Sequence, residues 1–143
     1  MRIAYQAIIE PGEDSGFFVR FPDLDEAFSE GETLSEILFN AEEVLNLTID
    51  GRIEEGMELP EPREHEGGVW IYPSPQVQAA LLVRFARRGR SLADLARALG
   101  TSWPSAQRLE NPRISPNLRQ LSKAATALGQ RLVLSFEPIR DAK

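Results

Sequence analysis

The sequence predicts an α+β fold: an antiparallel sheet with one helix, followed by an all-α region that ends in a strand. Three observations predict it. Alternating apolar runs and one capped helical stripe occupy the first sixty residues, and four helix-start signals follow residue 73. Between them, the stretch ELPEPREHEGG (58–68) interrupts both periodicities with Pro and Gly. We therefore expect two domains, residues 1–73 and residues 74–143.

Strands are predicted where apolar and polar residues alternate. Residues 3–10 and 17–21 alternate on either side of the turn sequence PGEDSG, which predicts an antiparallel hairpin. Residues 27–31 form a plausible third strand. The β-prone residues 69–72, bounded by a proline, are expected to return to the same sheet.

A helix is predicted to begin near residue 34, because Thr33 and Glu36 form a capping-box pair. Helical spacing predicts its buried stripe: Leu34, Ile37, Leu38, Ala41, Leu45 and Thr48. Phe39 and Leu47 fall on or near the opposite face, among carboxylates such as that of Glu43. Two large apolar side chains in such surroundings indicate either a partner-binding surface or ordinary packing under the linker.

The C-terminal region has signals for four helices. A serine that can cap or open a helix precedes each of them: Ser74, Ser91, Ser102 and Ser115. Glycines end three of them: Gly89, Gly100 and Gly129. The last helix is expected to bury the stripe Leu118, Leu121, Ala125 and Leu128.

Residues 131–138, RLVLSFEP, alternate in a β pattern after the last helix. A lone strand at the end of a domain needs a partner. Pairing with its copy in a second subunit would give a two-fold dimer, so we expect a homodimer or a higher homo-oligomer.

Charge is divided unevenly along the 143 residues, whose formal net charge is -6. Residues 1–66 contain four arginines and eighteen acidic residues, whereas residues 67–143 contain twelve Lys and Arg and four acidic residues. The C-terminal half can therefore approach phosphate although the whole chain is acidic. For the acidic half, charge alone leaves two explanations open: solubility, or a basic partner that it covers.

Composition excludes several classes of site. The chain has no cysteine and one histidine, which rules out disulfides, thiolate zinc sites and multi-histidine metal sites. His65 is expected to be a solvated linker residue. Asp23 and Asp25 are the nearest approach to a carboxylate pair and are expected to be turn formers. We expect no catalysis, metal or cofactor. Because there is neither a long apolar run nor a signal-peptide pattern, we expect a cytoplasmic protein without membrane contact.

The stretch GFFVRFPDLDEAFSEGETLSEILFNAEEVL resembles the HicB antitoxin family. The matching positions are Gly16, Phe17, Val19, Phe21 to Leu24, Gly31, Thr33, Leu34, Glu36, Asn40, Ala41 and Glu43. The resemblance implies a degraded RNase H-like domain with no known catalysis. It also implies a partner: a small, basic, HicA-like toxin that cleaves RNA and is silenced by binding. Phe39, Glu43 and Leu47 are the candidate contacts.

The stretch LADLARALGTS, with QRLEN after it, resembles the Xre/Cro-type helix-turn-helix of phage and bacterial repressors, which HicB proteins often carry. The resemblance implies that the second helix of the motif enters the major groove of operator DNA. By position, the DNA-contacting residues are Ser91, Ser102, Trp103, Pro104, Ser105, Gln107 and Arg108. Trp103 and Pro104 replace the polar residues usual in the family and offer apolar contact instead.

Together these features predict an antitoxin that neutralises a HicA-like toxin and represses its own operon. Two other classes stay open at this stage. A stand-alone repressor would use the N-terminal domain for sensing or oligomerisation, and a residual RNase H-like enzyme would need a divalent metal.

Overall fold

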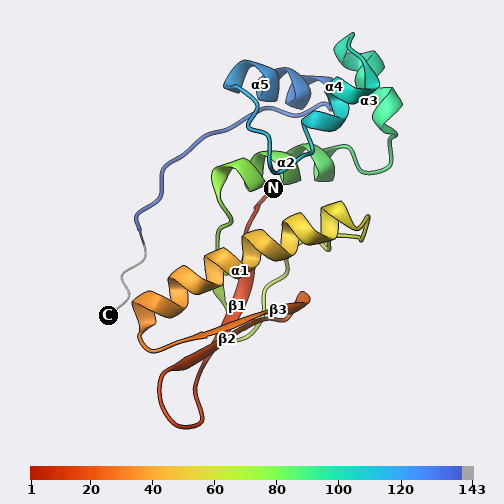
Figure 1. The fold of residues 1–143 in the computed structure, drawn as a ribbon. Coiled ribbons are helices and arrows are strands. Elements are labelled where there is room, and N and C mark those ends of the chain that lie inside the picture. Colours follow the sequence, from red (N-terminus) through yellow and green to blue (C-terminus); the bar gives the residue numbers. More distant parts are fainter. Residues whose placement is uncertain (140–143) are drawn as a thin grey trace. The chain divides into compact units, whose positions relative to one another are not determined.

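A computed structural model describes residues 1–139, which form two compact units. The N-terminal unit is built on residues 1–74 and the C-terminal unit on residues 75–138. Figure 1 shows that the first holds the sheet and one long helix, whereas the second is helical. The α+β class predicted from the sequence is confirmed. None of the helices in the described part of the chain combines the length and the hydropathy needed to span a bilayer.

The sheet has four strands, which are β1 (Tyr5–Pro11), β2 (Phe17–Phe21), β3 (Leu24–Gly31) and β4 (Val69–Ile71). Every neighbouring pair is antiparallel, and the order across the sheet is β3-β2-β1-β4. The last strand brings the chain back beside the first, with Tyr5 opposite Ile71. The third strand begins at Leu24 rather than residue 27, because a register irregularity after Arg20 places Phe21 opposite Leu24.

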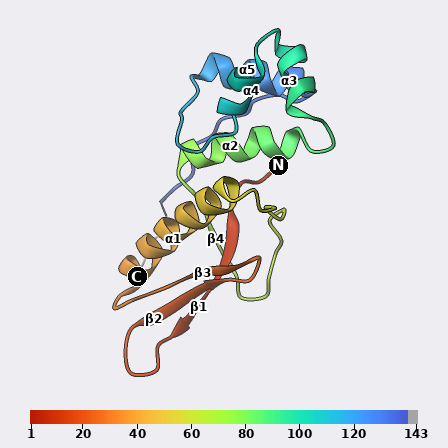
Figure 2. The same cartoon turned by 45° about the vertical axis from the view of Figure 1, so that its right-hand side comes forward.

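Helix α1 (Leu34–Glu54) covers one face of this sheet (Figure 2). The hydroxyl of Thr33 accepts a hydrogen bond from the backbone N–H of Glu36 at 3.1 Å, which confirms the predicted start. The buried stripe is Ile37, Ala41, Leu45, Thr48 and Ile49. The flanking leucines of the predicted stripe, Leu34 and Leu38, are only partly buried.

The segment between α1 and β4 is fastened to the sheet by the carboxylate of Asp23, whose side chain is 1% exposed. Its Oδ2 accepts the backbone N–H of Arg63 at 3.0 Å, and its Oδ1 accepts the guanidinium Nη2 at 3.0 Å. Nε2 of His65 also hydrogen-bonds to Oδ1, at 2.9 Å. The backbone N–H of His65 donates to the side-chain oxygen of Gln6 on β1.

The prediction of a solvated His65 is therefore wrong. Its side chain is only 23% exposed and is held against a buried carboxylate. Local sequence gives no sign of this contact, because its partners lie about forty residues earlier in the chain.

Burial alone would raise the pKa of Asp23, but the hydrogen bonds from Arg63 and His65 outweigh it and the pKa is lowered. A carboxyl whose pKa is lower in the folded state stabilises the fold above its unfolded pKa. That contribution is lost as the pH falls through the folded pKa.

The C-terminal unit contains α2 (Pro75–Ala86), α3 (Leu92–Leu99), α4 (Trp103–Arg108) and α5 (Leu118–Ala127). Its core consists of small and branched side chains from all four helices and from Leu128 just after α5: Ala79, Val83, Leu95, Ala96, Ala106, Leu121, Ala124 and Leu128. Ser91 and Ser102 cap α3 and α4 as predicted, and Gly100 ends α3 in the left-handed conformation at φ 65°.

The start of α5 differs from the prediction. Asn117, not Ser115, is the N-cap, and it forms a reciprocal capping box with Gln120. The hydroxyl of Ser115 instead donates to the side-chain oxygen of Gln76 on α2 at 2.8 Å. The buried stripe shifts accordingly: Ala124 replaces Ala125 as its central residue, and Leu118 is 61% exposed.

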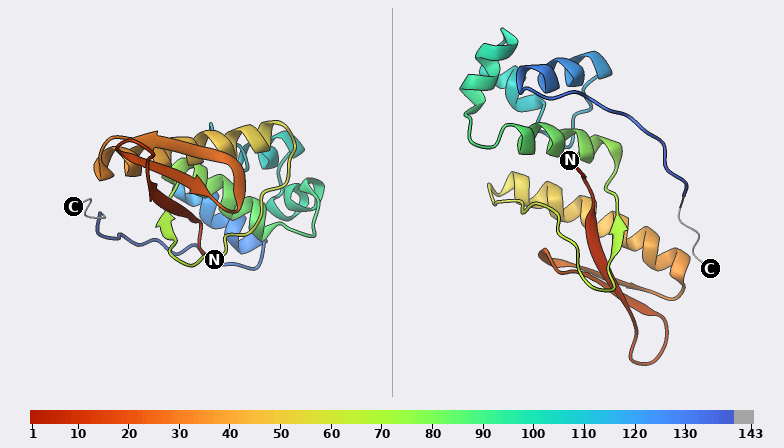
Figure 3. Two further views of the ribbon diagram at one scale, coloured as in Figure 1. Left: turned by 90° about the horizontal axis from the view of Figure 1, so that it is seen from below. Right: turned by 180° about the vertical axis from the view of Figure 1, so that it is seen from behind.

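The strand predicted at residues 131–138 does not form. Figure 3 shows the chain leaving α5 without further helix or strand, and residues 130–139 have no regular structure. A strand requires backbone hydrogen bonds to a neighbour, and no strand of the described chain is paired with this segment.

Replacing Asp23 with Asn should lower the free energy of unfolding by about 1–3 kcal/mol at pH 7, because the amide cannot accept all the hydrogen bonds made by the carboxylate. Urea titrations at pH 7, 5 and 3.5 would measure it. The difference from wild type should shrink as the pH falls below about 3.9, where the wild-type carboxyl loses its own contribution. Asp14→Asn, in an exposed turn, is the matched control. Equal effects of the two changes would contradict the assignment.

Candidate functional sites

The outer face of α1 carries an exposed stripe formed by Phe39, Glu43 and Leu47. These residues are four apart, so their side chains lie one above the next on the helix surface. Phe39 is 63% exposed and Leu47 is 70% exposed. The alternative of packing under the linker is therefore wrong for both residues. An apolar side chain at each end of the stripe with a carboxylate between them is suited to a partner that is both apolar and basic.

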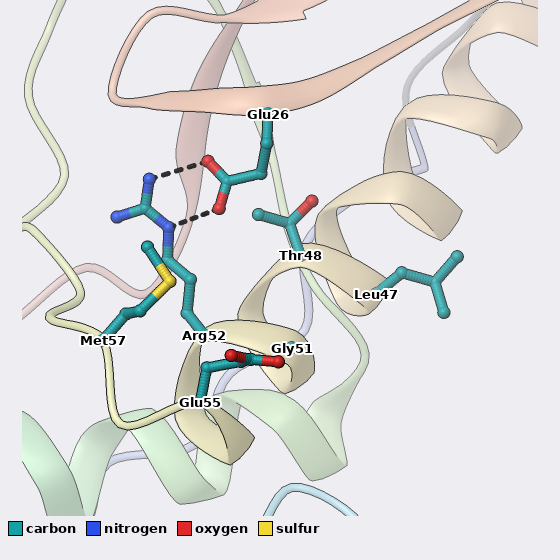
Figure 4. Close-up of a pocket in the computed structure, with 7 residues that line it drawn as sticks. All are labelled: Glu26, Leu47, Thr48, Gly51, Arg52, Glu55 and Met57. Atoms are coloured by element: carbon teal, nitrogen blue, oxygen red, sulfur yellow. Dashed lines mark hydrogen bonds and ion pairs between the residues drawn. The ribbon is translucent and has the colours of Figure 1, made fainter.

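A shallow hollow lies beside Leu47 at the C-terminal end of α1 (Figure 4). Glu26 of β3 and Arg52 form its polar side through two hydrogen bonds of 2.7 Å. The pKa of Glu26 is lowered, chiefly by these hydrogen bonds. The remaining lining comes from the last turns of α1 and the residues after it: Leu47, Thr48, Gly51, Glu55 and Met57. Because Glu26 is paired with a cation, Glu55 supplies the unbalanced negative charge of the hollow.

A second apolar patch, which the sequence analysis missed, lies on the sheet face that α1 does not cover. Phe18 and Phe28 stack there with ring centroids 6.1 Å apart, and Phe28 is 56% exposed. Arg20 and Glu10 form an ion pair of 3.0 Å on the same face. Alternation was the available signal: Val19 and Ala27 point inward, so Phe18 and Phe28 must point outward.

Helices α3 and α4 are joined by the three-residue turn Gly100–Ser102. Ala106 is the buried residue of α4, and this orientation turns four other side chains outward: Trp103, Pro104, Gln107 and Arg108. Trp103 is 46% exposed. Ser105 is half-buried, and its hydroxyl accepts a hydrogen bond from that of Ser102 at 3.0 Å. Ser91 is exposed and caps α3. The residues predicted to contact DNA thus lie on α4 and at the N-caps of α3 and α4.

Glu110 follows α4 and is 3% exposed, which the sequence analysis did not anticipate. It accepts two hydrogen bonds from Arg87 of the α2–α3 region, one of them at 2.9 Å from Nη2 to Oε1, the other from Nε to Oε2. Arg84 of α2 lies 3.8 Å from the same carboxylate. Two of the basic residues in the C-terminal half are therefore engaged in a buried ion cluster that ties the end of α4 to α2.

Among residues 1–139, no three His, Asp or Glu side chains gather in an arrangement that could hold a metal ion. Asp23, the more buried carboxylate of the Asp23–Asp25 pair, is occupied by Arg63 and His65.

Comparison with known proteins identifies the family of the chain. A family model described as "HicB-like antitoxin of bacterial toxin-antitoxin system" matches residues 5–71. "Antitoxin HicB 2" of Photorhabdus laumondii is 32% identical over 123 residues, which are 85% of this chain and 88% of that protein. The chain belongs to the HicB-like antitoxin family.

Other relatives match a larger share of this HicB-like antitoxin. "Antitoxin HicB 1" of Photorhabdus laumondii is 29% identical over 134 residues, covering 93% of this chain and 86% of that protein. "Antitoxin HicB" of Escherichia coli is 28% identical over 133 residues, covering 91% and 96%. The resemblance to HicB antitoxins is confirmed. Membership of an antitoxin family indicates a regulatory, non-catalytic role in a toxin-antitoxin system.

Replacing Glu110 with Ala in this antitoxin should lower the free energy of unfolding of the C-terminal unit by about 3 kcal/mol, because it leaves the partly buried guanidinium groups of Arg84 and Arg87 without their carboxylate. Thermal unfolding followed by far-ultraviolet circular dichroism would measure the loss. Glu137→Ala, which removes an exposed carboxylate, is the control. A change of the same small size in both variants would show that the cluster does not stabilise the unit.

Proposed function

We propose that this antitoxin binds a small, basic, HicA-like RNA-cleaving toxin through its N-terminal unit and represses the operon of the pair through its C-terminal unit. The observation that carries the first part is the exposed stripe of α1. Phe39 and Leu47 are large apolar side chains at 63% and 70% exposure, and Glu43 lies between them.

Charge supports the choice of partner. Residues 1–66 contain eighteen acidic residues and four arginines. Two of those arginines, Arg52 and Arg63, are engaged with Glu26 and Asp23, so the surface is left strongly negative. A toxin that binds RNA must present cationic groups, and an acidic surface competes with the RNA phosphates for those groups. Neutralisation then needs only occlusion of the RNA-binding surface.

The stripe and the hollow supply apolar contacts, which an interface needs in addition to charge complementarity. Interfaces gain most of their affinity from a few central apolar or aromatic residues, whereas rim charges mainly steer the partner and set specificity. Phe39 and Leu47 fit the anchoring role, and the hollow beside Leu47 can accept an apolar side chain next to Glu55.

We regard the N-terminal unit as a degraded RNase H-like domain, as the family resemblance implies. One helix across an antiparallel sheet is compatible with that relationship. With Asp23 held by the guanidinium of Arg63 and the imidazole of His65, the unit is better suited to binding than to metal-dependent cleavage.

We further infer that α3 and α4 form a helix-turn-helix of the Xre/Cro type that binds operator DNA. The support is geometric: a left-handed glycine closes α3, two capped helices follow each other, and the outward residues of α4 include one arginine. Arg108 can read guanine, and Trp103 offers apolar contact to a thymine methyl group. Ser91 and Ser102 lie at helix N-termini, where phosphates bind.

A stand-alone repressor is the alternative. It would give the N-terminal unit a sensing or oligomerising task and leave the α1 stripe without a basic partner. Family membership favours the antitoxin, and co-expression of the tagged chain with its neighbouring reading frames tests it. Recovery of a small basic protein whose toxicity disappears supports the antitoxin, and its absence supports the repressor.

Phe39→Ala and Leu47→Ala should each weaken the antitoxin–toxin complex about tenfold to a hundredfold, the range of an interface anchor residue. Isothermal titration calorimetry with the co-expressed partner gives the dissociation constant, and rescue of growth gives the consequence in cells. Phe28→Ala is the matched control, because it removes a similarly exposed aromatic ring, 56% against 63% for Phe39, from the other side of the sheet. If Phe28→Ala weakens the complex and the α1 variants do not, the toxin binds the open sheet face.

Arg108→Ala should weaken binding to the promoter DNA of the operon about tenfold to a hundredfold, because a bidentate contact to guanine is worth about 1–3 kcal/mol of discrimination. Binding to unrelated DNA should change much less. Arg119→Ala, an exposed arginine on α5, is the control. Gel-shift titrations at fixed salt measure both. Equal losses of affinity for promoter and unrelated DNA would show that Arg108 contacts phosphate and does not read a base.

A further inference from the structure

The exposed stripe of α1 continues beyond Leu47 to the end of the helix. Gly51 and Glu55 follow at the same spacing of four residues, so they lie on the next turns of the same row. Figure 4 shows both residues lining the hollow beside Leu47. The row thus passes from a large apolar side chain to a position without a side chain, and then to a carboxylate.

Gly51 leaves a gap in this row that the fold itself does not require. It lies inside α1 and its φ is not in the left-handed region, so alanine would be the more stable residue there. Apart from helix backbone and chain neighbours, no heavy atom of the described residues lies within 4 Å of the position that a Cβ would take. A helical glycine without a conformational or packing reason indicates close approach by another molecule.

We propose that the hollow at Gly51 receives one lysine or arginine side chain of the basic partner. The aliphatic stem of this side chain lies over Gly51, and its cationic end reaches Glu55. The inference rests on the proposed function, and it adds the chemistry of one contact and the residue that leaves room for it.

The apolar part of the hollow suits the stem of such a side chain. Leu47 is 70% exposed and Met57 is 49% exposed, so both offer apolar surface. Lysine and arginine bury their methylene groups along apolar surface while the charged end stays hydrated. With a volume of about 320 Å³ the hollow is at the lower limit of small-molecule sites, which suits it to a single side chain.

Electrostatics favours a cation at this end of α1. The hollow lies at the C-terminal end of a 21-residue helix, where the helix macrodipole is negative, and the side chain of Glu55 is exposed there. Repulsion from Arg52 is offset, because Glu26 engages its guanidinium through two hydrogen bonds of 2.7 Å. The free negative charge of the hollow is therefore available to a partner.

The hollow is already formed without a partner, because Arg52 connects its walls. Its Nε and Nη2 donate to Glu26 on β3, and its Nη1 donates to the backbone carbonyl of Glu58 at 3.0 Å. Glu58 directly follows Met57, so this hydrogen bond also holds the apolar wall in place. A preformed hollow binds a side chain without the entropic cost of ordering its own walls.

Gly51→Ala tests the gap, because its effects on the free antitoxin and on the complex should have opposite signs. The methyl group favours the helix, so the melting temperature of the free chain should rise by about 2–4 °C. In the complex the methyl group occupies the place of the stem. The dissociation constant should therefore rise about tenfold for Gly51→Ala and about a hundredfold for Gly51→Leu.

Two measurements separate these effects. Thermal unfolding followed by circular dichroism gives the stability of each free variant. Isothermal titration calorimetry with the small basic protein recovered by co-expression gives the affinity.

Glu55→Gln tests the cationic end of the contact. Loss of the charge should weaken the complex about threefold to fivefold. The dissociation constant should also become less dependent on salt between about 50 mM and about 500 mM NaCl. Glu13→Gln removes an exposed carboxylate from the turn after β1, so this matched control should change both quantities much less.

The outcomes distinguish this contact from the proposed function. A wild-type chain that binds no small basic protein would overturn the proposed function and the contact with it. Wild-type affinity in Gly51→Ala, or an unchanged salt dependence in Glu55→Gln, would overturn the contact alone. A lower melting temperature in Gly51→Ala would also contradict it, because the fold would then require the glycine.

Discussion

The buried carboxylate of Asp23 is the constraint on which the N-terminal unit depends. It holds the segment after α1 against the sheet through Arg63 and His65, and the backbone N–H of His65 then binds Gln6 on β1. This attachment directs the chain into β4, which completes the sheet beside β1. An acidic residue that composition alone would count among many surface charges is therefore a structural anchor.

The second unit also contains a buried carboxylate that is paired with arginine, but in a half of the chain where cations outnumber acids. There a single buried acid, Glu110, lies among arginines of α2 and the turn after it, whereas Asp23 lies in a unit with few cations. Each unit therefore holds one buried carboxylate against arginine side chains of the same unit. The two halves keep opposite net charges, which suits an acidic unit to a basic protein and a basic unit to a nucleic acid.

Features that depend on local chemistry could be predicted from the sequence. The Thr33 and Ser91 caps and the left-handed Gly100 each involve neighbours within a few residues, and each was predicted at its position. The contacts of His65 and Glu110 could not be, because their partners lie tens of residues away. The start of α5 was predicted wrongly for a related reason. Ser115 and Asn117 compete as caps, and the hydroxyl of Ser115 instead donates to the distant Gln76 on α2.

In the short helix α4, some residues hold the helix in place and their neighbours face outward. Its cap Ser102 and its buried Ala106 hold it in place, while Trp103, Gln107 and Arg108 point outward. Substitutions on the outer face therefore leave the packing of the unit unchanged. If α4 reads DNA as proposed, duplicated copies of such a gene can diverge in the DNA sequence that they bind while keeping one scaffold. Several toxin-antitoxin pairs could then coexist in one genome without regulating one another.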